Sequence, residues 1–359
     1  MREMMAVRVK GGSKPRDDEV PAPRPKVRIE EVARAAGVSA ATVSRVLNRT
    51  ALVSDELRDK VETTSKRLGY VAHGAARALA TRRSNAIGAI VPTLTNTIFS
   101  DAIEAFQQRL EAESHTMLLA TFDYDEELEY RNVRTMIERG VDGLMLVGAS
   151  HSRHLYDLLA SSGVPFVQTW APAKASEYPT IGYDNRTLAR MVVDHLVGLG
   201  HRDIAVVAGL TRHNDRVRSR IAGVRAALRR HKIPLPEERI VYTRYRIGDA
   251  RAAFQALQTR GPLPTALVAN NDVVAIGLLL EAVAQGIRVP ERISIVGVGD
   301  LEMVAHLNPP LTTVRTPKRA IGTMAAEYLL ARTQGRHFGI PSELSMELVV
   351  RGTTAPPPA

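Results

Sequence analysis

Cysteine is absent from the 359 residues of the chain, and aromatic residues make up only 4% of it. Without thiolates, transition-metal sites built on cysteine are excluded. No run of about eighteen apolar residues occurs, so we expect no membrane-spanning helix. The N-terminus also lacks the apolar core of a signal peptide. We therefore expect a cytoplasmic protein with no membrane partner.

Sequence motifs of common enzyme classes are missing as well. No Gly-x-Gly-x-x-Gly follows the first expected strand, and neither a phosphate-binding P-loop nor a Gly-x-Ser-x-Gly turn is present. His151 and His154 have the spacing of metal ligands on a helix, but no third ligand accompanies them, and we interpret them as surface histidines. The sequence thus predicts a binding protein that is not an enzyme and that uses no metal or cofactor.

The positive charge of the chain is concentrated near its N-terminus. The formal net charge is +10; residues 1–85 hold 18 Lys and Arg against 10 Asp and Glu, whereas residues 86–359 hold 30 against 28. A basic segment attached to a near-neutral remainder is typical of a nucleic-acid-binding domain, although a solvated basic face would give the same count.

Two short helices joined by a glycine are predicted between residues 29 and 48. Apolar residues at helical spacing predict the first helix over 29–36, and Gly37 ends it because glycine tolerates a left-handed backbone. Ser39 is a good N-cap for a second helix, whose inner stripe is Val43, Val46 and Leu47. The outward positions of that helix are Ala40, Ala41, Thr42, Ser44 and Arg45. Such a face suits the DNA major groove, although any two-helix hairpin with a glycine turn shares the periodicity.

The string Gly-Val-Ser-Ala-Ala-Thr-Val-Ser-Arg-Val-Leu-Asn over residues 37–48 resembles the signature of the LacI family of bacterial repressors. The resemblance implies a helix-turn-helix domain over residues 26–72 that binds operator double-stranded DNA as a homodimer on two half-sites. Arg45 is best suited to a bidentate contact with guanine. The resemblance places seven residues of this domain against DNA: Ser39, Ala40, Ala41, Thr42, Ser44, Arg45 and Asn48.

The segments on either side of this motif are a third helix and a tail. Ser54 is expected to cap a helix that Gly69 ends, which completes a three-helix headpiece. Residues 1–25 contain four prolines and few apolar positions, so they are expected to form a disordered tail.

Residues 73–85 correspond to the hinge of the family, a short helix that orders on operator DNA and inserts a leucine into the minor groove. The matching residues in this chain are Ala76 and Leu79. His73 replaces the asparagine usual in the family, and Gly74 lowers helix propensity, so the hinge helix should be harder to form. A plain linker is the alternative interpretation.

Short apolar runs alternate with amphipathic segments from residue 86 onward. This alternation is typical of an α/β fold in which helices cover parallel sheets. The expected strands are 86–91, 116–120, 143–147, 164–168, 204–208, 266–269 and 293–298. The expected helices are 99–113, 126–139, 188–199, 217–231, 272–285 and 321–331.

This part of the chain also resembles the LacI family, through Arg-x-x-Gly at 220–223 and Val-Ala-Asn-Asn-Asp at 268–272. The resemblance implies a periplasmic-binding-protein-like core of two Rossmann-like subdomains crossed by three strands. We expect this core over residues 86–354 and a short tail over 355–359. Its subdomain 1 should comprise about 86–184 and 316–345, and its subdomain 2 about 185–315.

An effector site is expected in the cleft between the subdomains, beyond the carboxyl ends of the strands. The family match places Arg220 against the effector, where a guanidinium suits a carboxylate or neighbouring hydroxyls. The lone Trp170 could stack on a sugar face or serve packing alone. The candidate effector-binding residues are Phe99, Asp123, Trp170, Arg216, Arg220, Asn271 and Gly299.

Gly299 stands where many family members have the first of two aspartates, so a negative charge that would repel an acid is missing. Residues 91–104 and 117–148 look most like the gluconate-utilisation branch of the family. Together these features predict a repressor that a sugar acid such as gluconate releases from a palindromic operator. A neutral sugar or a purine is the alternative effector, and a periplasmic sugar-binding protein is the alternative class.

Overall fold

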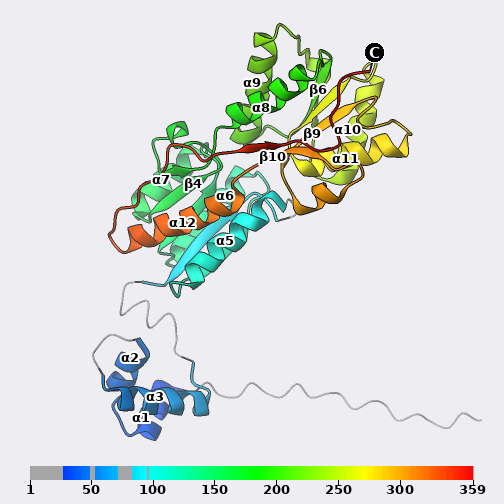
Figure 1. Cartoon of the computed structure of the whole chain (residues 1–359). Helices are drawn as coiled ribbons and strands as arrows, with labels where there is room; N and C mark the ends of the chain where they lie inside the picture. The colour runs from blue at the N-terminus through cyan, green and yellow to red at the C-terminus, as the bar shows by residue number, and fades with distance from the viewer. Residues whose placement is uncertain (1–26, 49–52, 72–82, 95–96, 359) are drawn as a thin grey trace, which may run out of the picture. The chain divides into compact units, whose positions relative to one another are not determined.

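The structure is a computed structural model that describes residues 27–48, 53–71, 83–94 and 97–358. The chain divides into two compact units, residues 1–80 and 81–359, whose elements are labelled in Figure 1. The expected tail over residues 1–25 lies outside the described residues, as do the expected hinge residues Ala76 and Leu79.

The described part of the N-terminal unit consists of three helices, α1 (Ile29–Ala36), α2 (Ala40–Asn48) and α3 (Asp55–Leu68). Gly37 ends α1 with a φ of 65°, and Ser39 caps α2 because its Oγ accepts from Thr42 N at 3.1 Å. Ser54 caps α3 in the same way, through Leu57 N at 3.4 Å. The buried side chains between the helices are Val32, Ala33, Ala36, Val43, Val46 and Val61.

Parallel strands form two sheets in the described part of the core. The first sheet has the order β2-β1-β3-β4-β5 and the second the order β11-β10-β9-β8-β6-β7; β11 alone pairs antiparallel. The first sheet contains β1 (Ala86–Val91), β2 (Thr116–Thr121), β3 (Gly143–Val147), β4 (Phe166–Thr169) and β5 (Thr180–Ile181). The second contains β6 (Ile204–Gly209), β7 (Ile240–Thr243), β8 (Ala266–Ala269), β9 (Ser294–Gly299), β10 (Thr312–Arg315) and β11 (Glu347–Val349).

Helices cover both sheets. The helices around the first sheet are α5 (Ser100–Glu111), α6 (Glu126–Glu138), α7 (Arg153–Ser162) and α12 (Lys318–Thr333). Those around the second sheet are α8 (Asn185–Gly198), α9 (Asp215–Arg230), α10 (Ile247–Thr259) and α11 (Asp272–Ala284). Single 3-10 turns are η1 (Thr97–Phe99), η2 (Ala173–Ala175), η3 (Glu237–Arg239) and η4 (Glu302–His306). The α/β fold class with a helix-turn-helix headpiece and two Rossmann-like lobes is therefore confirmed.

The described chain passes between the two sheets three times: after β5, after β10, and between α12 and β11. The second passage brings α12 back to the first sheet, where Figure 1 shows it alongside α5 although the two helices are far apart in sequence. The approach is close, because a Cβ at Gly322 of α12 would overlap the carbonyl oxygen of Ala102.

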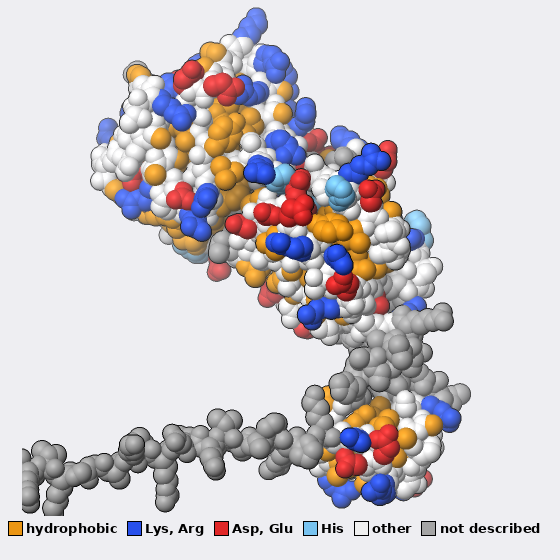
Figure 2. Space-filling model, turned by 180° about the vertical axis from the view of Figure 1, so that it is seen from behind, with side chains coloured by type: hydrophobic (Ala, Val, Ile, Leu, Met, Phe, Trp, Pro, Cys, Tyr) orange, Lys and Arg blue, Asp and Glu red, His pale blue; other side chains and the backbone are white. Residues whose placement is uncertain are grey.

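The surface of the core carries both signs of charge. Figure 2 shows Lys and Arg side chains interspersed with Asp and Glu on the face that it draws, as the near balance of charges in residues 86–359 requires. None of the helices formed by the described residues is long and apolar enough to cross a membrane.

Two sequence-based expectations about the core need correction. His151 is not a surface histidine: its side chain is almost fully buried, and its Nδ1 lies 3.1 Å from Glu129 Oε1. It also precedes Ser152, the N-cap of α7, so it is not on the same helix as the exposed His154. The other correction concerns β2, which is an edge strand with half-buried side chains rather than a buried one.

Candidate functional site

The expected DNA-reading helix α2 presents part of its predicted face to solvent. Ser39, Ala41 and Arg45 are exposed, and no hydrogen bond or ion pair within the described chain engages the Arg45 side chain. Thr42 is half-buried, and its Oγ1 lies 2.8 Å from Ser39 Oγ. The arrangement leaves Arg45 free to reach a base edge.

The other α2 residues predicted to contact DNA are less exposed or lie at the end of the described helix. Ala40 was expected to point outward, but it packs partly against the apolar centre of the headpiece. Ser44 is half-buried. Asn48 is the last residue of α2, and its side chain is outside the described part of the chain.

The core contains a small inner cavity of about 20 Å³ between the two sheets. Five of the predicted effector residues line it, and they come from both lobes: Phe99 and Trp170 from the first, and Arg216, Arg220 and Asn271 from the second. The other lining residues are Ile98, Tyr124, Tyr183, Asn214 and Tyr245.

A larger outer cavity of about 250 Å³ shares Tyr124, Asn214 and Tyr245 with the inner one. We call it the mouth of the cleft; its other lining residues are Thr93, Asp123, Leu210, Arg212, Thr243, Arg244 and Arg246. Asp123, the sixth predicted residue, is therefore at the mouth and not in the inner cavity.

Arg220 is a buried cation that neutral groups hold in place. It is 7% exposed; its Nη1 donates to Asn185 Oδ1 at 2.7 Å, and its Nε donates to Asn270 Oδ1. None of the carboxylates in the described chain forms an ion pair with it. By contrast, the neighbouring Arg216 pairs with Asp215 at 2.8 Å.

Several hydrogen-bond donors facing the inner cavity have no protein partner in the described chain. These are Trp170 Nε1 and Asn271 Nδ2; Arg216 Nη2 also has no hydrogen bond of good geometry, although the guanidinium lies beside the Tyr124 hydroxyl. The hydroxyls of Tyr183 and Thr316 lie near one another without a hydrogen bond of good geometry. Buried polar groups in native proteins are almost always paired with protein or with bound groups, so these donors are available to a group that supplies acceptors.

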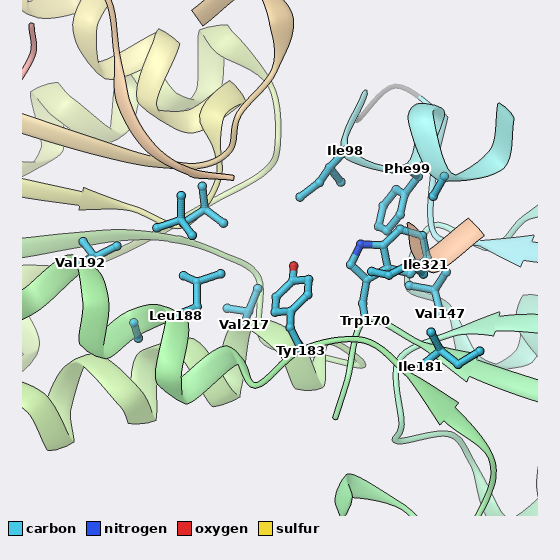
Figure 3. Close-up of a cluster of buried hydrophobic side chains, with 14 of the residues drawn as sticks. Ile98, Phe99, Val147, Trp170, Ile181, Tyr183, Leu188, Val192, Val217 and Ile321 are labelled. Atoms are coloured by element: carbon cyan, nitrogen blue, oxygen red, sulfur yellow. The ribbon is translucent and has the colours of Figure 1, made fainter. Parts of the chain in front are cut away.

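Trp170 offers its edge, not its ring face. Its side chain is 1% exposed and packs edge-on against Phe99, with ring centroids 5.1 Å apart. In Figure 3 its indole nitrogen and the Tyr183 hydroxyl face the same space below Ile98. Trp170 also has a φ of 61°, a strained backbone for a bulky residue, of the kind that clusters at binding sites.

The two lobes contact one another at the start of α9. Asp215 Oδ2 accepts from Ala149 N at 2.9 Å, and Arg216 Nη1 donates to the Val147 carbonyl at the end of β3 at 3.2 Å. A Cβ at Gly148 would overlap the Arg216 guanidinium and lie 2.8 Å from Asp215 Oδ1. The lobes approach this closely because residue 148 is a glycine.

Gly299 is not among the described residues that line either cavity. Its φ is 134°, and a Cβ there would lie 3.3 Å from Asp272 Oδ2. Asp272 is buried and accepts from Leu301 N at 2.9 Å and Thr313 Oγ1 at 2.6 Å; its burial raises its pKa to about 6. Backbone geometry beside this carboxyl is thus sufficient to require the glycine.

Comparison with known proteins decides the family. Residues 28–73 match the bacterial regulatory proteins of the lacI family, and residues 193–354 match the periplasmic binding protein-like domain. The HTH-type transcriptional repressor PurR of Vibrio parahaemolyticus is 31% identical over 332 residues, which cover 90% of this chain and 98% of PurR. The chain belongs to the LacI family.

Two further similarities agree with the assignment of this chain to the LacI family. The HTH-type transcriptional regulator GntR of Pseudomonas aeruginosa is 32% identical over 328 residues, covering 91% of this chain and 95% of GntR. The crystal structure of the Lac repressor dimer bound to operator and the anti-inducer ONPF matches with a TM-score of 0.81 and 28% identity, covering 92% of this chain and all of that one. The LacI-family chain is a DNA-binding transcriptional repressor and not an enzyme.

Sequence reasoning missed several residues of the LacI-family cleft. Tyr183 and Asn185 sit at the first passage between the lobes, and Asn214 caps α9; no local pattern marks them as ligand-facing. Asn270 could have been found, because it directly precedes Asn271 in the Val-Ala-Asn-Asn-Asp motif.

Proposed function

We propose that this LacI-family repressor binds a near-palindromic operator as a homodimer and is released from it by a small hydroxylated acid such as gluconate. The observation that carries the choice of an acid is Arg220, a buried guanidinium without a carboxylate partner among the described residues.

The burial of Arg220 favours an anionic ligand for an energetic reason. A buried charge without a counter-charge costs several kcal/mol, roughly, and is found in proteins mainly where a partner compensates it. The amide oxygens of Asn185 and Asn270 orient the guanidinium but do not neutralise it. A carboxylate of the effector would supply the missing charge.

The donors around Arg220 favour the hydroxylated part of the ligand. Trp170 Nε1 and Asn271 Nδ2 need acceptors, and sugar hydroxyls provide them. Burial raises the pKa of Tyr183 and of Tyr124, so both phenols stay protonated and able to donate. This donor-rich lining matches a polyhydroxy acid.

Release from DNA follows if the effector binds one arrangement of the lobes better than another. Its contacts would come from both lobes, since Trp170 belongs to the first and Arg220 and Asn271 belong to the second. A ligand can shift such an equilibrium only by its differential affinity for the two arrangements. We propose that the closed arrangement is the one with low operator affinity.

A neutral sugar or a purine remains the second candidate, and the aromatic lining favours it. Phe99, Tyr124, Trp170 and Tyr245 all border the inner cavity. The similar proteins do not distinguish between these effectors, because relatives named PurR and GntR are almost equally identical to this chain.

The test is Asn271→Asp, studied by calorimetry with gluconate, glucose and a purine base. Asn271 caps α11 through Oδ1, which accepts from Val274 N at 2.9 Å, while its Nδ2 is unpartnered. Aspartate keeps the cap but replaces the free donor by a charged acceptor. We expect wild-type protein to bind gluconate, and the variant to lose at least tenfold in gluconate affinity while keeping operator binding.

Arg220→Ala and Trp170→Phe complete the test of the acid proposal. Arg220→Ala should bind operator without responding to gluconate, and Trp170→Phe, which keeps the packing against Phe99, should weaken gluconate by a smaller factor. Heat from a neutral sugar or purine base with none from gluconate would reject the acid. The operator itself is found by selection from random DNA.

A further inference from the structure

The mouth of the cleft contains an excess of positive charge that the proposed acid site does not use. Arg212, Arg244 and Arg246 line it, against the single carboxylate of Asp123. All three arginines are exposed. Within the described chain no ion pair engages Arg244 or Arg246, so their charge is available to a ligand.

Arg212 is held in position by a neighbouring pair. Its Nε donates to His213 Nε2 at 3.0 Å, and His213 Nδ1 lies 2.5 Å from Glu126 Oε1. That carboxylate is therefore engaged by the histidine. Asp123 remains the acidic group among the described residues of the cavity wall.

Helix N-termini add to the positive potential at the mouth. Asn214 and Arg246 are the N-cap residues of α9 and α10, and both line the cavity. No side chain of the described residues caps α10, and a Cβ at Gly248 in its first turn would meet nothing within 4 Å. Asp249 of that turn is not a lining residue. An open helix N-terminus next to arginines is a favourable site for phosphate.

We propose that the effector carries a phosphate monoester, which Arg212, Arg244 and Arg246 bind at the mouth. The inference rests on the proposed function, because it takes the inner cavity to hold the hydroxylated acid end of the same molecule. The shared walls of the two cavities, Tyr124, Asn214 and Tyr245, make one ligand spanning both possible.

A phosphate fits the mouth better than a second carboxylate does. It carries about −1.5 to −2 charges at neutral pH and three acceptor oxygens, which matches three guanidinium groups opposed by one carboxylate. The planar donors of arginine bind phosphate oxygens in pairs. The mouth, of about 250 Å³, also has more room for a phosphate group than the inner cavity of about 20 Å³.

The experiment is calorimetry on the full chain at fixed physiological salt with two matched ligand pairs: gluconate and 6-phosphogluconate, and glucose and glucose 6-phosphate. We expect the phosphate to raise affinity at least tenfold in the acid pair. In the Arg244→Ala/Arg246→Ala double variant this gain should fall below threefold, with gluconate binding as in the wild type.

Arg229→Ala is the matched control, because it removes an exposed arginine of α9 that does not line the mouth. It should keep the full phosphate gain; an equal loss in this control would show a general charge effect and overturn the inference. Gluconate binding without any gain from phosphate would overturn it while leaving the acid effector intact. An arginine-dependent gain for glucose 6-phosphate over glucose, without gluconate binding, would support the phosphate site and reject the acid. Binding of none of the four ligands would overturn both.

Discussion

At the scale of single residues, Asp272 has an unusual pH dependence for a carboxyl group. Burial raises its pKa to about 6 from an ordinary value of 3.8. Between these pH values the folded chain binds more protons than the unfolded one, so this group makes stability fall as the pH rises through the window. The shift corresponds to roughly 3 kcal/mol.

Asp272→Asn should remove this pH dependence. The amide keeps an acceptor for Leu301 N and can donate to Thr313 Oγ1, while it carries no charge. We expect urea unfolding to show the variant about 1–3 kcal/mol more stable than the native chain at pH 7 and nearly equal at pH 4. A variant that is less stable at pH 7 would show that the ionised carboxylate is well solvated.

Arg45 governs a second prediction at this scale, which concerns DNA specificity. Its exposed side chain is expected to contact a guanine, a contact worth about 1–3 kcal/mol of discrimination. Arg45→Ala should flatten base preference at one position of each half-site in a selection from random DNA. Headpiece stability should change little, since the side chain is exposed and no hydrogen bond or ion pair within the described chain engages it. A variant with the native preference at every position would reject the contact.

At the scale of elements, the packing of α12 on α5 depends on Gly322. A Cβ there would overlap the Ala102 carbonyl, and overpacking of this kind costs about 1–3 kcal/mol. Gly322→Ala should therefore lower the stability of the core by that amount. Gly198→Ala is the control, because a Cβ at the end of α8 would meet nothing within 4 Å. Equal effects of the two substitutions in thermal unfolding would contradict the packing argument.

Elements whose signals are local could be predicted from the sequence. The helix 29–36, the Gly37 stop and the Ser39 and Ser54 caps agree with the structure residue by residue, because capping depends on neighbours within four positions. Local patterns did not predict β5, β7, β10, β11, α7 or α10. β5 has only two residues and β11 three, too few to show a period.

The residues of the cleft were predicted only in part, because only some of them have a local sequence signal. Five of seven expected effector residues line the inner cavity, and each of them lies at an element end or within a family motif. Asn185 and Asn270 contact Arg220 from 35 and 50 positions away in sequence. Such partners are set by how the lobes pack, which no local pattern contains.

At the scale of the whole molecule, the proposed homodimer has a candidate surface on the core. Leu280 and Val283 of α11 and Met303 of η4 are large apolar side chains that are 43%, 56% and 50% exposed. Leu280 and Val283 are three positions apart on α11 and therefore share one face of the helix, and exposed apolar side chains on one face favour self-association. Light scattering should give twice the 39.2 kDa of one chain.

A Leu280→Glu/Val283→Glu double variant should be monomeric and bind operator weakly, because two linked headpieces bind two half-sites better than one does. Val350→Glu, at a residue that is also 56% exposed, is the control and should remain dimeric. A double variant that keeps the dimer mass would place the interface elsewhere on the chain.

The glycine at position 148 has a consequence for the phenotype of mutations at its codon. Because any side chain there would push against Asp215 and Arg216, at a φ of 104° that is strained for a residue with a Cβ, missense changes at this codon should hinder closure of the lobes and shift Arg216, which lines the inner cavity. Cells carrying such alleles should need more inducer for the same expression. In a collection of mutants graded by induction threshold, substitutions at this position should therefore order themselves by side-chain volume, with alanine the mildest.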